Sequence, residues 1–135
     1  MQIRQTMKKM NGTAILIIIA TLSMGQKSDI VQRNTEVQRA GSDYAFTEGP
    51  AVAPDGRVFF TDQPNDRIYV WDENDGITLW LEGTGRSNGM YFDAKGRLVT
   101  CADLNNQLAY FDENKNLVPI HEGYKGKHLN APNDL

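Results

Sequence analysis

Short apolar segments alternate with turn residues along residues 47–124. In the first part the segments read GPAVAP, RVFFTD, RIYVWD and ITLWLE, and the breaks contain Pro54-Asp55-Gly56 and Asp75-Gly76. The segments are rich in Val, Ile, Phe, Tyr and Trp, which favour strands, whereas Asp-Gly and Pro favour tight turns. No window has a helical period long enough to compete. The pattern therefore predicts four short antiparallel strands and an all-β fold.

The same pattern returns without a gap, at an offset of 40 positions. Glu48 aligns with Asn88 and Gly49 aligns with Gly89, and a Gly-Arg turn follows each pair at the same distance. A fixed period of roughly 20 to 50 residues is typical of repeat architectures. The sequence therefore contains two copies of one structural unit.

Four antiparallel strands in about 40 residues make one blade of a β-propeller. We predict blades at residues 42–83 and 84–124, and a third blade that begins near residue 128 with LNAPNDL. There Asn133 takes the place of Glu48 and Asn88, after a loop that lengthens the spacing between blades. Propellers typically close with roughly four to eight blades, so we expect the sequence to be the first part of a longer protein.

The first residues of the innermost strands are the candidate site. Equivalent positions in successive blades lie on one ring, so Glu48, Asn88 and Asn133 are predicted to present oxygen atoms to one mouth of the central channel. A carboxylate with amide carbonyl oxygens suits a hard divalent cation such as Ca²⁺. The alternative is local, because these residues also favour turns at strand entries.

The segment 1–25 has the layout of a secretory signal peptide. Basic residues precede the apolar run AILIIIATLSM, and small residues follow at Ser23 and Gly25. The run is about 11 residues long, whereas a spanning helix needs about 20, so stable membrane insertion is disfavoured. We predict residues 1–25 as a signal peptide, residues 26–41 as a linker or leader strand, and export to the periplasm or the medium.

Charge and cysteine content exclude two classes of function. Removing the three basic residues of the leader changes the formal charge from −3 to −6, which repels phosphate backbones and makes nucleic acid an improbable partner. The single cysteine, Cys101, lies in an apolar strand pattern. It is predicted to be a buried small hydrophobic residue rather than a nucleophile.

Structural roles are predicted for four other polar residues. His121 is predicted at the surface of an outer strand. His128 lies with two lysines in the loop before blade three, which is either solvated or a roof over the mouth. Asp62 and Asp103 end second strands and are expected to accept hydrogen bonds from turn amides.

The segments FTEGPAVAPDGRVFFTD, NDRIYVWD, SNGMYFDAKGRLVTCAD and LNAPNDL resemble the gluconolactonase and senescence-marker-protein (regucalcin) family. The resemblance runs from Phe46 to Leu135, and its specific part is a Glu-Gly-Pro entry followed by a Pro-Asn-Asp-Leu entry on the right blades. Diisopropyl-fluorophosphatase and the paraoxonases are more distant relatives. The resemblance implies a six-bladed propeller with a divalent cation, usually Ca²⁺, in the central channel.

The resemblance also implies roles for individual residues. Glu48 matches a metal ligand, Asn133 a metal or substrate ligand, and Asn88 a residue that faces substrate at the same mouth. The remaining ligands, an Asn and an Asp that is also the expected general base, belong to later blades beyond Leu135. The resemblance therefore assigns no catalytic residue to this chain.

The expected function is an exported, divalent-metal-dependent hydrolase of a sugar lactone. The cation would polarise the carbonyl and an activated water would attack it. One alternative is a non-catalytic propeller that binds a ligand or a protein, which predicts stability independent of metal. A redox propeller with a quinone-type cofactor is a third hypothesis, but Glu48 and Asn133 argue against it.

Overall fold

A computed structural model describes residues 35–121 and 123–135 of the chain. The predicted signal peptide and the first part of the predicted linker lie outside the described residues. A compact unit runs from Gln38 to Leu135, and the fold is described for this unit alone.

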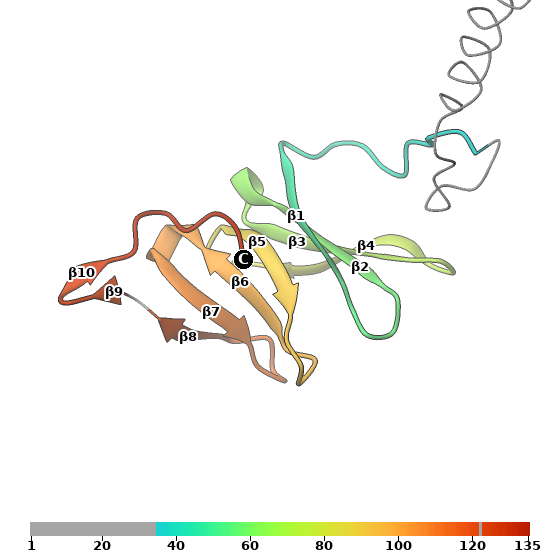
Figure 1. Cartoon of the computed structure of the whole chain (residues 1–135). Coiled ribbons are helices and arrows are strands. Elements are labelled where there is room, and N and C mark those ends of the chain that lie inside the picture. Colours follow the sequence, from blue (N-terminus) through green and yellow to red (C-terminus); the bar gives the residue numbers. More distant parts are fainter. Residues whose placement is uncertain (1–34, 122) are drawn as a thin grey trace, which may run out of the picture. The chain divides into compact units, whose positions relative to one another are not determined.

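Two four-stranded antiparallel sheets form the unit, each a simple meander (Figure 1). The first sheet contains β1 (Thr47–Val52), β2 (Val58–Asp62), β3 (Arg67–Asp72) and β4 (Gly76–Glu82). The second contains β5 (Ser87–Phe92), β6 (Leu98–Ala102), β7 (Gln107–Phe111) and β8 (Leu117–His121). These sheets confirm the predicted all-β class and the eight predicted strands.

The period of the sequence is also the period of the structure. The strands β1, β2 and β3 begin at the positions that the repeat aligns with the first residues of β5, β6 and β7. The 3₁₀ turn η1 (Gln63–Asn65) aligns in the same way with η2 (Asp103–Asn105). Among the described residues, no helix is long and apolar enough to cross a membrane.

The hydrophobic core lies between the two sheets. Phe59 of β2 packs edge-on against Phe92 of β5 at 5.2 Å between ring centroids, and against Trp80 of β4 at 5.5 Å. Trp80 in turn packs edge-on against Phe111 of β7 at 5.2 Å. Facing layers of large apolar side chains exclude water from both sheets, as the stacking of blades requires. The buried core contains Ala51, Ala53, Phe59, Ile68, Val70, Met90, Leu98 and Phe111.

The innermost strands approach each other through glycine. Gly49 has a φ of +48°, and a Cβ placed on it would lie 2.2 Å from the carbonyl oxygen of Asn88. A Cβ on Gly89 would lie 2.5 Å from the carbonyl oxygen of Asn133. The Gly89 amide donates a hydrogen bond to that same oxygen at 2.7 Å. Only glycine permits such close backbone approach, and the segment that ends the chain therefore lies beside β5 (Figure 1).

The predicted loop before blade three contains a small hairpin. β9 (Gly123–Tyr124) pairs with β10 (Lys127–His128), and Lys125 and Gly126 connect them with φ values of +51° and +75°. Two residues with positive φ are the signature of a type I′ hairpin turn. Leu129–Leu135 follows without a strand of its own.

Two expectations about aspartates are corrected. Asp62 accepts hydrogen bonds from the amides of Ala45 and Phe46, which belong to the segment that enters β1 rather than to a turn. Asp103 accepts a hydrogen bond from the Gln63 side chain. The turn amides are instead bonded by aspartates nearer the opposite end of the strands, and these are Asp55, Asp72, Asp93 and Asp112.

Candidate functional site

The candidate site lies where β1 and β5 begin and where β2 and β6 end, and this end of the sheets is called the mouth. Antiparallel pairing brings these strand ends together, since Thr47 is opposite Asp62 and Ser87 is opposite Ala102. The turns η1 and η2 lie at the same end because they follow β2 and β6 directly.

Equivalent positions of the two repeats make direct contact at the mouth. Gln63 and Asp103 align in the repeat, and the Gln63 Nε2 donates a hydrogen bond of 2.6 Å to the Asp103 Oδ2. The same carboxylate oxygen lies 3.3 Å from a guanidinium nitrogen of Arg86. Arg86 precedes β5, and its amide donates to the carboxylate of Asp66 at 2.6 Å. A polar network therefore ties the mouth ends of the two sheets to each other.

The three residues predicted to share the mouth belong to backbone segments that lie side by side. Glu48 directly precedes Gly49, whose α-carbon faces the carbonyl of Asn88, and Gly89 faces the carbonyl of Asn133. Glu48 and Asn88 are half-buried, and Asn133 is exposed. The roles of these side chains in binding a metal or a substrate stay predictions.

Two buried polar atoms near the mouth have no hydrogen-bond partner among the described residues. They are Oδ1 of Asn88 on β5 and Oγ1 of Thr61 on β2. Buried oxygen atoms in folded proteins nearly always have a partner, so an exception points to strain, to an unseen water or to a ligand. Thr61 lies directly opposite Glu48 in the β1–β2 pair, which places one of the two atoms beside the predicted metal ligand.

The donors at the mouth fit a hard divalent cation. Glu48 offers a carboxylate, and the unpartnered Oδ1 of Asn88 is an acceptor, as a ligand oxygen must be. In residues 35–121 and 123–135, no group of three or more His, Cys, Asp or Glu side chains could hold a metal. The predicted site residues offer the Glu48 carboxylate and the amide oxygens of Asn88 and Asn133, a set that suits Ca²⁺ better than a soft metal.

Cys101 is a structural residue, as its sequence context predicts. It is 1% exposed on β6, and its Sγ lies 3.5 Å from the carbonyl oxygen of Asp134. Burial, together with the charge of Asp134, raises the pKa of the Cys101 thiol. A thiol with a raised pKa is a weaker nucleophile at neutral pH, because less of it is ionised.

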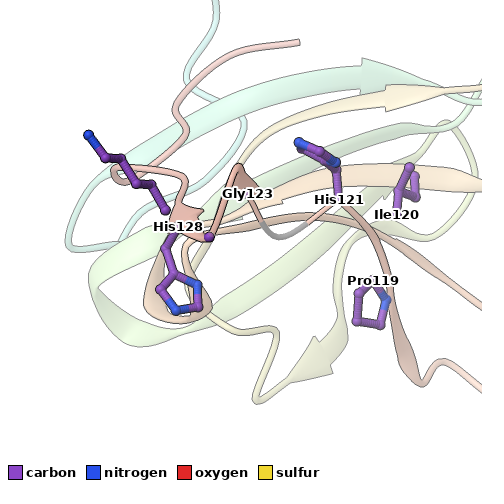
Figure 2. A pocket seen from close by; sticks show the side chains of 7 residues that line it. Pro119, Ile120, His121, Gly123 and His128 are labelled. Carbon is purple, nitrogen blue, oxygen red and sulfur yellow. The ribbon is translucent and has the colours of Figure 1, made fainter.

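The two histidines line a cavity that none of the three predicted site residues borders. A cavity of about 720 Å³ is lined by His121 of β8 and by His128 of β10, together with Pro119 and Gly123. Figure 2 shows the two imidazole rings pointing to opposite sides. Both histidines are exposed, which confirms the surface position predicted for His121. His128 belongs to the β9–β10 hairpin, and the two alternatives for this segment, a solvated loop or a roof over the mouth, stay predictions.

Two further cavities border the sheets. One of about 470 Å³ is lined by Glu48 and by the aromatic rings of Tyr44 and Phe60. The other, of about 620 Å³, is lined by Phe59 and Arg97 at the end of the sheets opposite the mouth. Only the first of these two touches a predicted site residue.

Thr61 and the Gln63–Asp103 contact were not predicted as part of the site. The turn at Pro54-Asp55-Gly56 would by itself place Asp62 opposite Glu48, and the β-bulge between Glu48 and Ala51 shifts the partner to Thr61. The sequence carried no signal for that bulge. The signal for Gln63 and Asp103 was their equivalence in the repeat, but residue types alone do not show that two side chains bond each other.

Comparisons with known proteins agree with this architecture. A gluconolactonase of Zymomonas mobilis subsp. mobilis is 26% identical over an alignment of 141 positions, which covers 93% of this chain and 39% of that protein. A solved gluconolactonase from Xanthomonas campestris superposes with a TM-score of 0.64 at 29% identity, over 67% of this chain and 31% of that chain. The chain is similar to gluconolactonases in sequence and in fold. No family model matches the sequence.

Other solved structures support the fold. A protein whose assignment as a gluconolactonase is provisional superposes with a TM-score of 0.71 at 25% identity, over 76% of this chain and 36% of that chain. Virginiamycin B lyase from Staphylococcus aureus, at 14% identity and a TM-score of 0.50, shares the fold alone. The two sheets are thus propeller blades, as the sequence predicts. The chain spans about two fifths of the curated gluconolactonase that it matches.

Proposed function

We propose that the protein is an exported lactone hydrolase that depends on a divalent cation, with Ca²⁺ as the favoured metal and a sugar lactone as substrate. The observation that carries the proposal is the similarity to a gluconolactonase over 93% of the chain. Two features at the mouth support it: the half-buried carboxylate of Glu48 and the Oδ1 of Asn88, which has no hydrogen-bond partner among the described residues.

The residues of this chain would bind the cation and orient the substrate. Glu48 would hold the cation through its carboxylate, and the side-chain oxygen of Asn133 would be a further ligand or a contact to substrate. A bound divalent cation supplies Lewis-acid stabilisation of negative charge that develops on a carbonyl oxygen. The Oδ1 of Asn88 would accept a hydrogen bond from a sugar hydroxyl, which satisfies a buried acceptor and orients the lactone ring.

The reaction is a hydrolysis at the lactone carbonyl. A water adds to the carbonyl carbon, the bond between that carbon and the ring oxygen breaks, and the product is the open hydroxy acid. A general base must remove a proton from the attacking water. Glu48 suits that role poorly, since an ionised carboxylate that holds a cation is a weak proton acceptor. The base is expected on a later blade.

The proposal of export rests on residues 1–25. Their basic start, short apolar run and small residues at positions 23 and 25 support recognition and cleavage by a signal peptidase. Mass spectrometry of the protein purified from culture medium or periplasm tests this directly. A mature chain that begins near Gln26 supports export, and an intact Met1 in the cytoplasm contradicts it.

The test of activity uses the product of the complete reading frame. Hydrolysis of glucono-1,5-lactone is followed by acid release, with added Ca²⁺, after chelation, and in Glu48→Gln. We expect activity that chelation removes, that Ca²⁺ restores, and that Glu48→Gln lowers by at least about 100-fold, because the ligand charge is lost. Hydrolysis that survives chelation contradicts the metal. A folded protein that binds Ca²⁺ without hydrolysing lactones supports a ligand-binding propeller instead.

A further inference from the structure

Thr61 has a buried hydroxyl that the proposed mechanism does not use. The residue is 0% exposed, and its Oγ1 has no hydrogen-bond partner among the described residues. A hydroxyl carries one donor and two acceptor lone pairs, and burial without a partner destabilises the folded protein. Valine would fill the same space as threonine at this position. Packing therefore does not explain the hydroxyl, whereas a hydrogen-bond partner would.

The strand register places this hydroxyl beside Glu48. Thr61 and Glu48 are directly opposite in the antiparallel β1–β2 pair. Residues so paired send their side chains to the same face of the sheet, with Cβ atoms about 4.5–5.5 Å apart. A β-bulge follows Glu48 before pairing resumes at Ala51, so Thr61 is the last paired residue of β2 between the mouth and the bulge.

Thr61 lies on the face of β2 that packs against the second sheet, whereas Glu48, beside the bulge, also lines the cavity that contains the Phe60 ring. Ile68, which is opposite Thr61 on β3, and Phe59, two positions before it, both belong to the core between the sheets. The second unpartnered atom, Oδ1 of Asn88, belongs to β5 of the adjoining sheet. An acceptor cannot donate to the Glu48 carboxylate, whereas the Thr61 hydroxyl can.

We propose that Thr61 is a positioning residue for Glu48. Its hydroxyl donates a hydrogen bond to one carboxylate oxygen of Glu48 and so holds the other oxygen toward the mouth. The two side chains are not hydrogen-bonded in the structure. The bond would form after rotation of the long Glu48 side chain. Partners of this kind raise metal affinity about 10- to 100-fold in other proteins. The inference rests on the proposed function, because it requires a cation at Glu48.

The test measures Ca²⁺ binding by calorimetry with the product of the complete reading frame. Thr61→Val is expected to weaken Ca²⁺ binding at least about 10-fold, and Thr61→Ser, which keeps the hydroxyl, is expected to restore it. The matched control is Thr100→Val. Thr100 is equally buried, but its hydroxyl already has a partner, because it donates to the Gly89 carbonyl oxygen at 3.4 Å. Thr100→Val should leave Ca²⁺ affinity unchanged.

A second measurement separates positioning from a structural role. Thr61→Val removes an unpaired buried hydroxyl, so the metal-free variant should resist urea at least as well as the native protein. In a Glu48→Gln background, Thr61→Val should weaken Ca²⁺ binding no further. Thr61→Cys copies Cys101, the equivalent residue of the second sheet, and gives a further variant without the hydroxyl if the valine disturbs folding.

The outcomes distinguish the two proposals. If Glu48→Gln abolishes Ca²⁺ binding and Thr61→Val leaves it unchanged, the positioning role is wrong and the metal site stands. If Thr61→Val lowers Ca²⁺ affinity equally in the native and Glu48→Gln backgrounds, the positioning role is also wrong. The hydroxyl would then act on another group, for example on Asn88 through a water molecule. A native protein that binds no Ca²⁺ refutes the proposed metal site itself.

Discussion

Asp66 and Asn106 occupy equivalent positions of the two repeats and anchor the same kind of link between blades. Both have left-handed backbone conformations, with φ values of +54° and +51°. The Oδ1 of Asp66 accepts hydrogen bonds from the amides of Thr84 and Arg86 at 2.9 and 2.6 Å, on the segment that leads into β5. The Oδ1 of Asn106 accepts one from the Ala131 amide at 2.9 Å, on the segment after β10.

This equivalence predicts that the acceptor oxygen matters more than the charge at position 66. Asp66→Ala should destabilise the fold by about 2 kcal/mol or more, since it leaves the buried Thr84 hydroxyl and two amides without their acceptor. Asp66→Asn keeps the oxygen and copies Asn106, so its loss should stay below about 1 kcal/mol. Urea unfolding measures both. Equal losses in the two variants would show that the charge itself is needed.

Gly49 is predicted to tolerate no side chain. Gly49→Ala would place a Cβ 2.2 Å from a backbone oxygen at a φ of +48°, so we expect a destabilisation of about 3 kcal/mol or more. Gly56→Ala is the control, because its φ of +91° is also strained but nothing lies within 4 Å. That variant should lose only about 1–2 kcal/mol. Thermal unfolding compares them, and a similar loss in both would contradict a steric cause.

Asp62 is predicted to make stability depend on pH in the acid range. Burial opposes its ionisation, but hydrogen bonds from the Phe46 amide, the Asn65 side chain and the Ala45 amide outweigh this and lower the pKa of Asp62 below its ordinary value of 3.8. A lowered pKa means that the folded state favours the charged form. The stabilisation is therefore present above pH 3.8 and is lost as pH falls through the folded pKa.

The measurement is urea unfolding between pH 7 and pH 3 for the native protein and for Asp62→Asn. The stability difference between them should be largest at neutral pH and should shrink below about pH 4. The comparison is needed because other aspartates, Asp55 and Asp93 among them, also have lowered pKa values and contribute to the native curve. A constant difference across the range would rule out Asp62 as the source.

Cys101 is predicted to be unreactive in the folded protein. It is 1% exposed and burial raises the pKa of its thiol, so Ellman's reagent should modify it only as fast as the protein unfolds. In concentrated guanidinium chloride the reaction should be complete within the mixing time. Rapid modification of the folded protein at neutral pH would show that β6 opens locally, which its position inside the second sheet argues against.

The strands could be predicted from the sequence because each one ends at a strong turn signal. Asp55-Gly56 and the equivalent Lys95-Gly96 separate the first two strands of each sheet, and the constant offset of the repeat then fixes the second sheet from the first. The hairpin β9–β10 was missed because Lys125-Gly126 is a weaker turn signal than Asn-Gly. Its strands are only two residues long.

The site could be predicted only in part. Repeat equivalence placed Glu48, Asn88 and Asn133 at one end of the sheets, and the glycine contacts confirm that their backbones are neighbours. The partners of Asp62 and Asp103 could not be predicted in the same way. Whether a carboxylate turns to its own loop or to a distant segment depends on side-chain direction and packing, which residue types do not reveal.

The close approach at Gly49 and Gly89 makes the spacing of the inner strands independent of the side chains that form the candidate site. Main-chain atoms alone set the distance between adjacent inner strands at these positions. The residues beside them can therefore be exchanged without changing the diameter of the ring. Evolution could thus alter the residue before each glycine to change what the channel recognises, while the glycines themselves stay fixed by geometry.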